Sequence, residues 1–351
     1  MPKGDEGDVL IVAGGTGGHI FPALVFGRWI AEHRGLSVSY LCGSRPIEAE
    51  IYASMGATPH RLSIDGSPLG TRSPVKILRR IGAMLLAFRE TARCLFETRP
   101  RAVFLFGGYV SLVPLLLCRL RGIPIVVHEQ NALAGRVTRL ASWLGASVVT
   151  GWEECGGLRG PHVAVGIPVR WPERIPREEA LARLGLPIPD GARIVGVATG
   201  SLGSSALMAE LIGAAGELRA RDPSIELLIL GDASVGDKEG IWPVGRQWDM
   251  RPFYSLCDVL VCRAGGSTLA EALSWRIPAV AVPWGGAADG HQERNALSFV
   301  AAGGGAMWRE GEGRDALVDA IGDLLGRRAS LDLEGASGED VCLAIARAVG
   351  L

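Results

Sequence analysis

The sequence lacks the motifs of several large enzyme classes. It contains no H-E-x-x-H, no G-x-S-x-G, no Walker A sequence and no D-x-D. These motifs place the groups that a metalloprotease, a serine hydrolase, a P-loop ATPase or a metal-dependent sugar transferase needs. Their absence argues against these four classes, and no metal site is expected.

Cysteine pairs and long hydrophobic runs are missing as well. The seven cysteines are scattered and include no C-x-x-C pair, which is typical of a reduced, cytoplasmic chain. The polar segment Met1–Asp8 predicts no signal peptide. The uncharged run Ala102–Cys118 has 17 residues, fewer than the roughly 20 that a spanning helix needs. This run predicts a strand, a loop and a buried helix, and no transmembrane segment is expected.

Net charge is nearly absent, at −1 for the whole chain, which argues against nucleic-acid binding. The two halves differ, however. Residues 1–170 carry 19 Lys and Arg against 12 Asp and Glu, whereas residues 171–351 carry 17 against 25. The basic first half is compatible with an anionic phospholipid surface, and equally with a chance difference between two domains.

Glycine, in contrast, is abundant, with 49 residues in a chain of 351. There is no G-X-Y period, and 48% of the residues are hydrophobic, which excludes a collagen-like or disordered chain. The glycines are clustered, and several clusters follow short apolar runs. Their placement therefore indicates loops at the ends of buried strands.

Short apolar runs alternate with helical patterns in both halves of the chain, which predicts doubly wound parallel sheets. In the first half the expected strands are 8–13, 37–41, 60–64, 102–106, 123–127 and 147–149, with helices over 21–32 and 45–55. In the second half the expected strands are 194–198, 225–230, 259–262 and 279–282, with a helix over 205–219.

A segment with three prolines, Gly166–Pro176, separates the halves and is typical of a semi-rigid linker. Two doubly wound halves joined by a hinge predict a cleft between the carboxyl ends of their strands. Ligands bind outside those strand ends in sheets of this kind.

The loop Gly14–His19 directly follows the first strand and precedes a helix. Its glycines allow backbone N–H groups to face an anion, and the helix adds its positive N-terminus. A dinucleotide site fits poorly, because the spacing is not G-x-G-x-x-G and the second strand ends without a ribose-binding acid. A lone His19 is more often structural than catalytic, but its place beside such a loop makes it a candidate for the site.

Four further loops follow predicted strands. Gly107–Ser111 and His128–Asn131 lie in the first half, and Gly200–Ser204 and Arg263–Glu271 in the second. Polar residues at His128–Asn131 either carry chemistry or cap a helix. Gly265–Ser267 would offer amides to a diphosphate, and Glu271 either binds a ribose diol or favours the helix dipole. Pro283–Asn295 adds a polar loop with hydrogen-bonding groups suited to a sugar.

Five of these segments together resemble the motifs of the MurG family, in order and over nearly the whole chain. They are GGTGGHIFPAL (Gly14–Leu24), GGYVS (Gly107–Ser111), HEQN (His128–Asn131), RAGGSTLAE (Arg263–Glu271) and AADGHQERNA (Ala287–Ala296). Members of this family transfer N-acetylglucosamine (GlcNAc) from UDP-GlcNAc to lipid I, the undecaprenyl-diphosphate-linked MurNAc-pentapeptide. This reaction belongs to peptidoglycan synthesis, and so to cell-wall biogenesis, cell shape and cell division.

The resemblance implies the glycosyltransferase-B fold, in which two Rossmann-like α/β domains face each other across a cleft. Residues 1–166 would form the acceptor and membrane-facing domain, 167–177 the linker, and 178–351 the UDP-GlcNAc domain. The resemblance leaves open whether the last helix packs back on the first domain. It implies no cofactor, a peripheral position on the cytoplasmic face of the plasma membrane, and contacts with other cell-wall synthesis proteins.

The resemblance also implies roles for individual residues. His19, Asn131 and Glu129 would be catalytic. The acceptor would be bound by Gly14, Gly15, Gly107, Gly108, Tyr109, Ser111, His128 and Gln130. The donor would be bound by Thr16, Gly17, Gly18, Asn131, Arg170, Gly200, Ser201, Gly203, Gly266, Ser267, Thr268, Glu271, Gln292 and Asn295.

Within that family the sugar moves with inversion from an α-linked donor to a β-linkage, most simply by one displacement. His19 is our candidate for the base that takes the proton of the acceptor C4 hydroxyl, or for a group that orients the acceptor. Gly266–Thr268, Gly200–Gly203 and Arg170 would stabilise the leaving UDP. Glu271 would hold the ribose and Gln292 the GlcNAc hydroxyls.

The segment 72–101 carries eight basic residues against two glutamates and has apolar residues at helical spacing. This pattern is typical of an interfacial helix, or of a core-packing helix with a solvated basic face. The family resemblance favours contact with an anionic membrane. The residues expected to make that contact are Ile77, Arg79, Arg80, Ile81, Met84, Leu85 and Phe88.

The chain also departs from the family pattern. Ile167 stands where the family usually has Asn, Leu202 where it has Gln, and Gly286 where it often has His. Arg246-Gln247-Trp248 replaces the segment that meets the uracil. These departures keep two alternatives open: another metal-independent UDP-sugar transferase or epimerase of the same fold, and a non-catalytic relative that binds nucleotide sugar or lipid.

Overall fold

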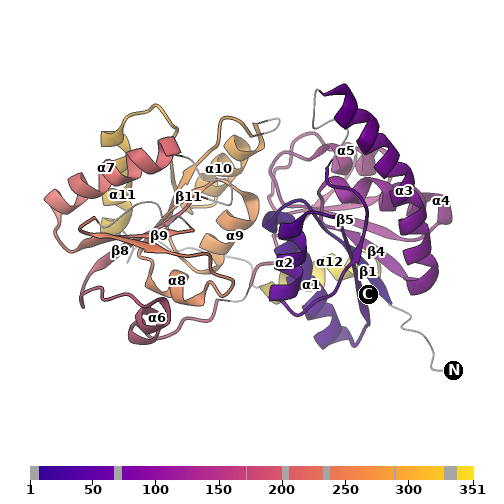
Figure 1. Ribbon diagram of the computed structural model, residues 1–351, viewed down its shortest axis with the longest axis horizontal. Coiled ribbons are helices and arrows are strands. Elements are labelled where there is room, and N and C mark those ends of the chain that lie inside the picture. Colours follow the sequence, from indigo (N-terminus) through magenta and orange to yellow (C-terminus); the bar gives the residue numbers. More distant parts are fainter. Residues whose placement is uncertain are drawn as a thin grey trace. The chain divides into compact units, whose positions relative to one another are not determined.

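The computed structural model describes residues 8–66, 73–170, 172–199, 205–231, 238–287, 290–327 and 338–351. The chain divides into two compact units (Figure 1). Unit 1 comprises Met1–Arg170 and Ala336–Leu351, and unit 2 comprises Trp171–Gly335. Each unit is one parallel sheet with its own helices and core.

Unit 1 contains a seven-stranded sheet in the order β3-β2-β1-β4-β5-β6-β7, in which every neighbouring pair is parallel. Its strands are β1 (Val9–Val12), β2 (Val38–Cys42), β3 (His60–Arg61), β4 (Ala102–Leu105), β5 (Ile125–Glu129), β6 (Ser147–Thr150) and β7 (Val163–Ala164). Its helices are α1 (Gly17–Arg34), α2 (Pro46–Ser54), α3 (Pro74–Thr98), α4 (Leu112–Arg121), α5 (Arg136–Trp143) and α12 (Gly338–Arg347), with the 3-10 helix η2 (Tyr109–Ser111).

Unit 2 contains a six-stranded sheet in the order β10-β9-β8-β11-β12-β13, again entirely parallel. Its strands are β8 (Arg193–Ala198), β9 (Ile225–Leu230), β10 (Ile241–Val244), β11 (Val259–Arg263), β12 (Ala279–Val282) and β13 (Gly305–Met307). Its helices are α6 (Arg177–Leu184), α7 (Ser205–Arg221), α8 (Arg251–Leu256), α9 (Gly266–Ser274), α10 (His291–Ala301) and α11 (Arg314–Arg327).

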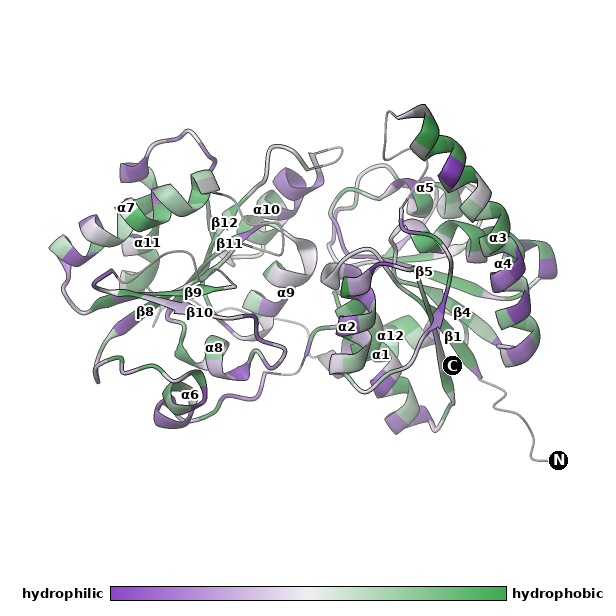
Figure 2. Ribbon diagram, viewed as in Figure 1, coloured by the Kyte–Doolittle hydropathy of each residue, from purple (hydrophilic) through white to green (hydrophobic). Residues whose placement is uncertain are grey.

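The cores explain why the apolar runs form central strands. β1, β4 and β12 are buried at every residue, as expected for strands that are covered by helices on both faces. Figure 2 shows the central strands mostly in green, and the hydrophilic residues in purple mainly on helices and loops. The doubly wound α/β class predicted from the sequence is therefore confirmed in both units.

The last helix, α12, belongs to unit 1 although the chain reaches it from unit 2. It contacts α1, and the two helices lie side by side in Figure 1. Its buried side, which includes Val341, Cys342 and Ile345, explains this attachment, because those apolar side chains leave water only by packing on unit 1.

Several expected boundaries were wrong. The first helix begins at Gly17 rather than Phe21, so the glycines of its motif form its first turn. His128 and Glu129 belong to β5 and not to a loop. Three short edge strands, β7, β10 and β13, were not predicted from the sequence. The cleft between the two units stays a prediction.

Candidate functional site

In both units the order of the strands reverses beside the first strand, between β1 and β4 in unit 1 and between β8 and β11 in unit 2. Parallel sheets bind ligands outside the carboxyl ends of the strands at such a switch point. The predicted loops Gly14–His19 and Gly107–Ser111 follow β1 and β4. Arg263–Glu271 begins with the last residue of β11. Topology therefore places the main motifs where ligands are expected.

The loop after β1 leads into α1 with Thr16 as its N-cap residue. The amides of His19 and Ile20 both donate to the Thr16 carbonyl, at 3.1 and 3.2 Å. The first turn of α1 carries no acidic residue, so the helix's own side chains do not offset its positive end. This geometry suits an anion at the start of α1.

The loops after β1 and β4 pack directly on each other. Gly107 and Gly108 have φ angles of +94° and +82°, a conformation that side chains disfavour. A Cβ on Gly108 would overlap the Gly14 carbonyl oxygen, and a Cβ on Gly107 would lie 2.7 Å from His19 Cδ2. The glycines of GGYVS are therefore required by close contact with the first loop.

His19 lies at this junction and is half-buried. Its Nδ1 lies 3.4 Å from Thr16 Oγ1, and its Cδ2–Nε2 edge faces Gly107. The ring is thus held between the two glycine loops, at the switch point of the sheet. This is the position in which a base would meet a ligand bound at the strand ends.

His128 is fully buried and has a structural environment. Its Nε2 donates to the Gly166 carbonyl at 2.8 Å, and its Nδ1 accepts from Gln130 Nε2 at 3.1 Å. Its ring stacks on Phe106. Burial lowers the pKa of His128 to about 4, so the ring is neutral near pH 7. His128 and Gln130 were predicted to bind the acceptor, but both side chains are buried and brace the end of β5.

Glu129 is also buried, and its carboxylate accepts four hydrogen bonds. Oε1 accepts from the backbone amide and the Nδ2 of Asn131, both at 3.0 Å. Oε2 accepts from the Gly135 amide at 2.9 Å and from Thr138 Oγ1 at 2.6 Å. These contacts fix half-buried Asn131 and the start of α5, which gives Glu129 a positioning role in this structure.

In unit 2, α9 begins at Gly266, and its first turn has no acidic residue. Ser267 and Thr268 therefore lie in the first turn, next to the positive end of the helix. Asn295, predicted to bind the donor, is buried, and its Nδ2 donates to the Ala264 carbonyl at 3.0 Å. It ties α10 to the loop that precedes α9.

Two side chains that received no individual role from the sequence support this region, although Arg263 opens the RAGGSTLAE motif. Tyr254 donates its hydroxyl hydrogen to Glu271 Oε2 at 2.8 Å. Arg263 binds Glu310 through two hydrogen bonds, both of 3.1 Å. Glu271 lies 17 residues from Tyr254, and Glu310 lies 47 residues from Arg263. No local sequence pattern therefore indicates these two contacts. Gln292 Oε1 accepts from the Trp284 amide at 2.9 Å, and the predicted contact of Gln292 with the donor sugar stays a prediction.

The remaining predicted residues have varied surroundings. The Arg170 guanidinium lies over the Phe21 ring at 4.7 Å, so it belongs to unit 1. Ile167 is buried and fills the space beside Gly151. Gly286 lies against the Trp284 ring. Gly200, Ser201, Leu202 and Gly203 lie outside the described residues.

Two acceptor-side predictions depend on Glu48, which the motifs did not indicate. This fully buried carboxylate accepts hydrogen bonds from the Gly15 amide and from the Tyr109 hydroxyl, at 2.8 and 2.7 Å. Burial and the hydrogen bond to Glu48 raise the pKa of Tyr109. Ser111 donates its hydroxyl to the Gly107 carbonyl at 2.9 Å. The predicted acceptor loop is thus held mainly by contacts within unit 1.

A row of exposed apolar side chains runs along α3. It consists of Val75, Leu78, Ile81, Leu85 and Leu86. Of the predicted apolar contacts, Ile81 and Leu85 are in this row, whereas Ile77, Met84 and Phe88 are half-buried, and Phe88 packs on the unit 1 core. Arg79 is exposed and pairs with Asp65 at 2.9 Å, and the side chain of Arg80 lies outside the description. Among the described helices, none is both long and apolar enough to span a bilayer.

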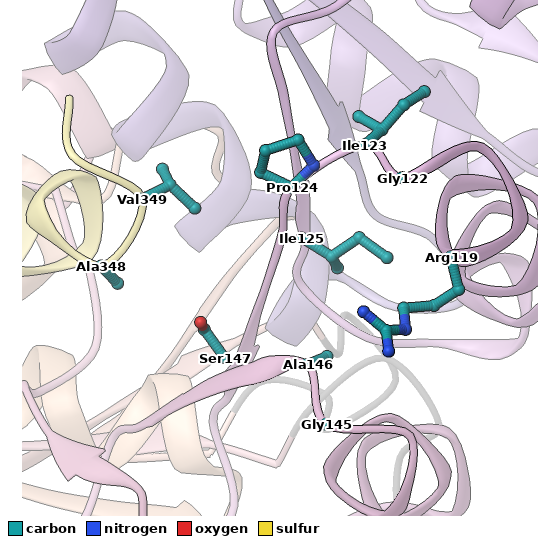
Figure 3. A pocket seen from close by; sticks show the side chains of 10 residues that line it. All are labelled: Arg119, Gly122, Ile123, Pro124, Ile125, Gly145, Ala146, Ser147, Ala348 and Val349. Carbon is teal, nitrogen blue, oxygen red and sulfur yellow. The ribbon is translucent and has the colours of Figure 1, made fainter.

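A cavity of about 300 Å³ lies elsewhere in unit 1 (Figure 3). It is lined by Arg119, by the first residues of β5 and β6, and by Ala348 and Val349 near the C-terminus. Because parallel strands all run in one direction, this cavity lies at the edge of the sheet opposite the glycine loops. It does not belong to the candidate site. In the described parts of the chain, no group of three or more His, Cys, Asp and Glu side chains could hold a metal ion.

Comparison with known families gives the class of protein. Residues 9–150 match the glycosyltransferase family 28 N-terminal domain, and residues 194–337 match the glycosyltransferase family 28 C-terminal domain. Together with the two doubly wound units and their switch-point loops, these matches define a two-domain glycosyltransferase.

Its curated relatives are more specific. The chain is 31% identical to the UDP-N-acetylglucosamine–N-acetylmuramyl-(pentapeptide) pyrophosphoryl-undecaprenol N-acetylglucosamine transferase of Ectopseudomonas mendocina, over 95% of this chain and 93% of that protein. It is 34% identical to the enzyme of the same name from Alkalilimnicola ehrlichii, over 87% and 85%. The chain therefore belongs to the MurG family of N-acetylglucosaminyltransferases.

Solved structures agree on the fold. The crystal structure of Acinetobacter baumannii MurG matches with a TM-score of 0.68 and 23% identity, covering 97% of this chain and 99% of that one. The UDP-GlcNAc 2-epimerase from Neisseria meningitidis matches with a TM-score of 0.66 and 13% identity, covering 97% and 98%. Because both identities are low, these likenesses bear on architecture alone, and the curated relatives decide between transferase and epimerase.

Proposed function

We propose that this chain transfers GlcNAc from UDP-GlcNAc to the C4 hydroxyl of the MurNAc of lipid I, with inversion at the anomeric carbon. The observation that carries the proposal is the placement of His19 between the Gly14–Thr16 and Gly107–Gly108 loops at the switch point of unit 1. Membership of the MurG family supplies the two substrates.

On the acceptor side, the start of α1 would face the diphosphate of the lipid, which reassigns Thr16, Gly17 and Gly18 from the donor to the acceptor. His19 would take the proton of the C4 hydroxyl as its oxygen attacks the anomeric carbon. The glycosidic bond forms at that carbon while its bond to the UDP oxygen breaks. Asn131, fixed by Glu129, would orient the sugar.

On the donor side, the first turn of α9 would stabilise the charge that develops on the leaving UDP. Glu271 would accept hydrogen bonds from the ribose, and Gln292 would contact the GlcNAc hydroxyls. These roles require the sites of both units to meet around one pair of reactants, and that arrangement is part of the proposal.

The deciding experiment mixes the full chain with UDP-GlcNAc and a lipid I analogue and measures release of UDP. Release that requires the acceptor is expected. Release without acceptor would point to an epimerase or hydrolase, and no release would point to a non-catalytic relative. Replacing His19 by Ala should lower turnover by roughly 10²–10⁴-fold if it is the base. A near-normal kcat would assign it an orienting role at most.

We further propose that the chain acts at an anionic membrane, bound peripherally through α3. The support is the exposed row from Val75 to Leu86 together with the basic residues beside it. Apolar side chains would enter the boundary of headgroups and acyl chains, while arginines contact anionic lipids. This would bring the acceptor loops of unit 1 to a lipid-linked substrate.

A further inference from the structure

Glu48 connects three separate segments at the carboxyl edge of the unit 1 sheet. It lies in the first turn of α2 and is fully buried. Its Oε1 accepts from the Gly15 amide at 2.8 Å and from the Tyr109 hydroxyl at 2.7 Å, and its Oε2 accepts from the Gly43 amide at 2.6 Å. The donors come from the loop after β1, the end of β2 and the helix after β4.

Arg45 holds the same loop from its other side. Its Nη1 donates to the Gly15 carbonyl at 3.2 Å, its Nε donates to the Asp65 carbonyl at 2.7 Å, and its guanidinium lies over the Tyr109 ring at 4.8 Å. Both polar groups of the Gly15 backbone therefore bind side chains of one short segment. This fixes Gly15 at its φ of +94°, directly before the start of α1.

The hydrogen bond from Gly15 has a consequence for anion binding. Its amide donates to a carboxylate of the protein, so the first glycines of the loop serve to orient the chain. Removing one of the three donors from a buried carboxylate costs free energy. Glu48 therefore holds the start of α1 and the Tyr109 side chain in one arrangement. The family resemblance implies that Gly14 and Gly15 contact the acceptor directly. This geometry instead favours acceptor binding at the start of α1.

We propose that Glu48 is a positioning residue for acceptor binding, which sets the start of α1 and the Tyr109 ring for the diphosphate of the lipid acceptor. The inference rests on the proposed function, because that function supplies the acceptor. Glu48 itself has no exposed surface, so it acts only through the groups that it holds. A purely structural role would lower the fraction of folded enzyme and leave the acceptor KM unchanged.

The test is Glu48→Gln in the full chain, with exposed Glu50→Gln on the same helix as the matched control. An amide in this position must turn an NH₂ group toward at least one N–H or O–H donor. We expect the KM for a lipid I analogue to rise about 10-fold or more, with the Kd for UDP within twofold of the wild type. Glu50→Gln should match the wild type in both measurements. An unchanged acceptor KM in Glu48→Gln, or an equal loss of UDP affinity, would overturn the assignment.

Tyr109→Phe provides a second route if Glu48→Gln folds poorly, because it removes one partner of the carboxylate from another segment. It should also raise the acceptor KM and leave the UDP Kd unchanged. In the double variant the two effects should be less than additive, since both changes break one network. Additive effects would argue against the positioning role of Glu48. An unchanged acceptor KM in Tyr109→Phe would argue against it as well. A wild-type chain without acceptor-dependent UDP release would overturn the proposed function as well, whereas normal wild-type release with unaffected variants overturns only the role of Glu48.

Discussion

The carbonyl oxygen of Gly14 lies against the α-carbon of Gly108, where the loops after β1 and β4 meet. Replacing Gly108 by Ala should therefore both overlap this oxygen and strain the backbone at a φ of +82°. With a ψ of 169°, Gly108 lies in a region that essentially only glycine adopts, where a side chain costs about 1–3 kcal/mol. The overlap with the Gly14 oxygen adds to this cost. We expect a lower melting temperature and a loss of acceptor-dependent turnover of 10-fold or more.

Gly122→Ala is the matched control for that change. Gly122 also has a positive φ, +68°, but its ψ of 20° places it in the left-handed helical region, and nothing lies within 4 Å of the position that its Cβ would take. Gly122→Ala should cost about 1–2 kcal/mol of stability from backbone strain, without any overlap, and its turnover should be close to that of the wild type. If the two variants lost the same stability and activity, contact with Gly14 would not be what requires glycine at position 108.

Buried His128 should make folding sensitive to acid. Its pKa is about 4 in the folded chain, against about 6.5 when unfolded. Between these values the unfolded chain binds a proton that the folded chain excludes, so stability is fully present above about pH 6.5 and falls as the pH drops toward 4. The loss would amount to up to about 3 kcal/mol. His128→Gln should flatten this part of a melting-temperature profile against pH.

Exposed His60 provides the comparison for the acid profile. His60→Gln should keep the slope of the wild type between pH 6.5 and 4, because an exposed ring is hydrated in both states. The assignment to His128 would fail if its replacement left the slope unchanged.

The hydroxyl of Tyr254 should influence nucleotide binding through Glu271. Tyr254→Phe removes the 2.8 Å hydrogen bond to Oε2 and frees the carboxylate to leave its orientation. Hydrogen bonds to charged groups contribute about 1.5–3 kcal/mol, of which part would be felt by the ligand. We expect UDP affinity, measured calorimetrically, to fall by about 3- to 30-fold.

Tyr52→Phe is suited as its control. This tyrosine is also buried, and its hydroxyl donates to the Ala13 carbonyl at 3.1 Å in unit 1. It should cost similar stability without changing the UDP Kd. Equal affinities in Tyr254→Phe and the wild type would show that Glu271 needs no such support, or that it does not bind the nucleotide.

The exposed row on α3 predicts membrane affinity. Leu78 and Leu85 are 74% and 68% exposed, and Figure 2 shows α3 with both hydrophobic and hydrophilic residues. Because burying a leucine contributes about 1.5–3 kcal/mol, changing both to Ser should weaken binding to anionic vesicles by about 100-fold or more in co-sedimentation. Leu297→Ser, at an exposed position of α10 in unit 2, should have no effect.

Lipid composition separates the two contributions to this binding. The wild type should bind vesicles with anionic lipid more tightly than neutral vesicles, and salt should weaken the difference. Equal binding to anionic and neutral vesicles would argue against a contribution of the basic residues. Unchanged binding of the double serine variant would argue against a contribution of the two leucines.

The hydrophobic pattern alone was sufficient to predict the central strands of both sheets and the parallel, doubly wound class. It works there because strands such as β1 and β12 are buried on both faces, so their whole sequence is apolar. It failed for edge strands. β10 contains Pro243, which interior strands exclude, and its assignment depends on pairing with β9.

For the candidate site, the sequence located the glycine loops that follow the strands, because glycine clusters and helix starts are local features. Only the tertiary structure decided what the individual polar groups do. The resemblance assigned Glu129 to catalysis and His128 to the acceptor, whereas both side chains are buried with protein partners, and no motif indicated Glu48. The physical reason is that a hydrogen bond depends on which atoms meet. Gly15 and Tyr109, 33 and 61 residues from Glu48, reach it only once the sheet has formed.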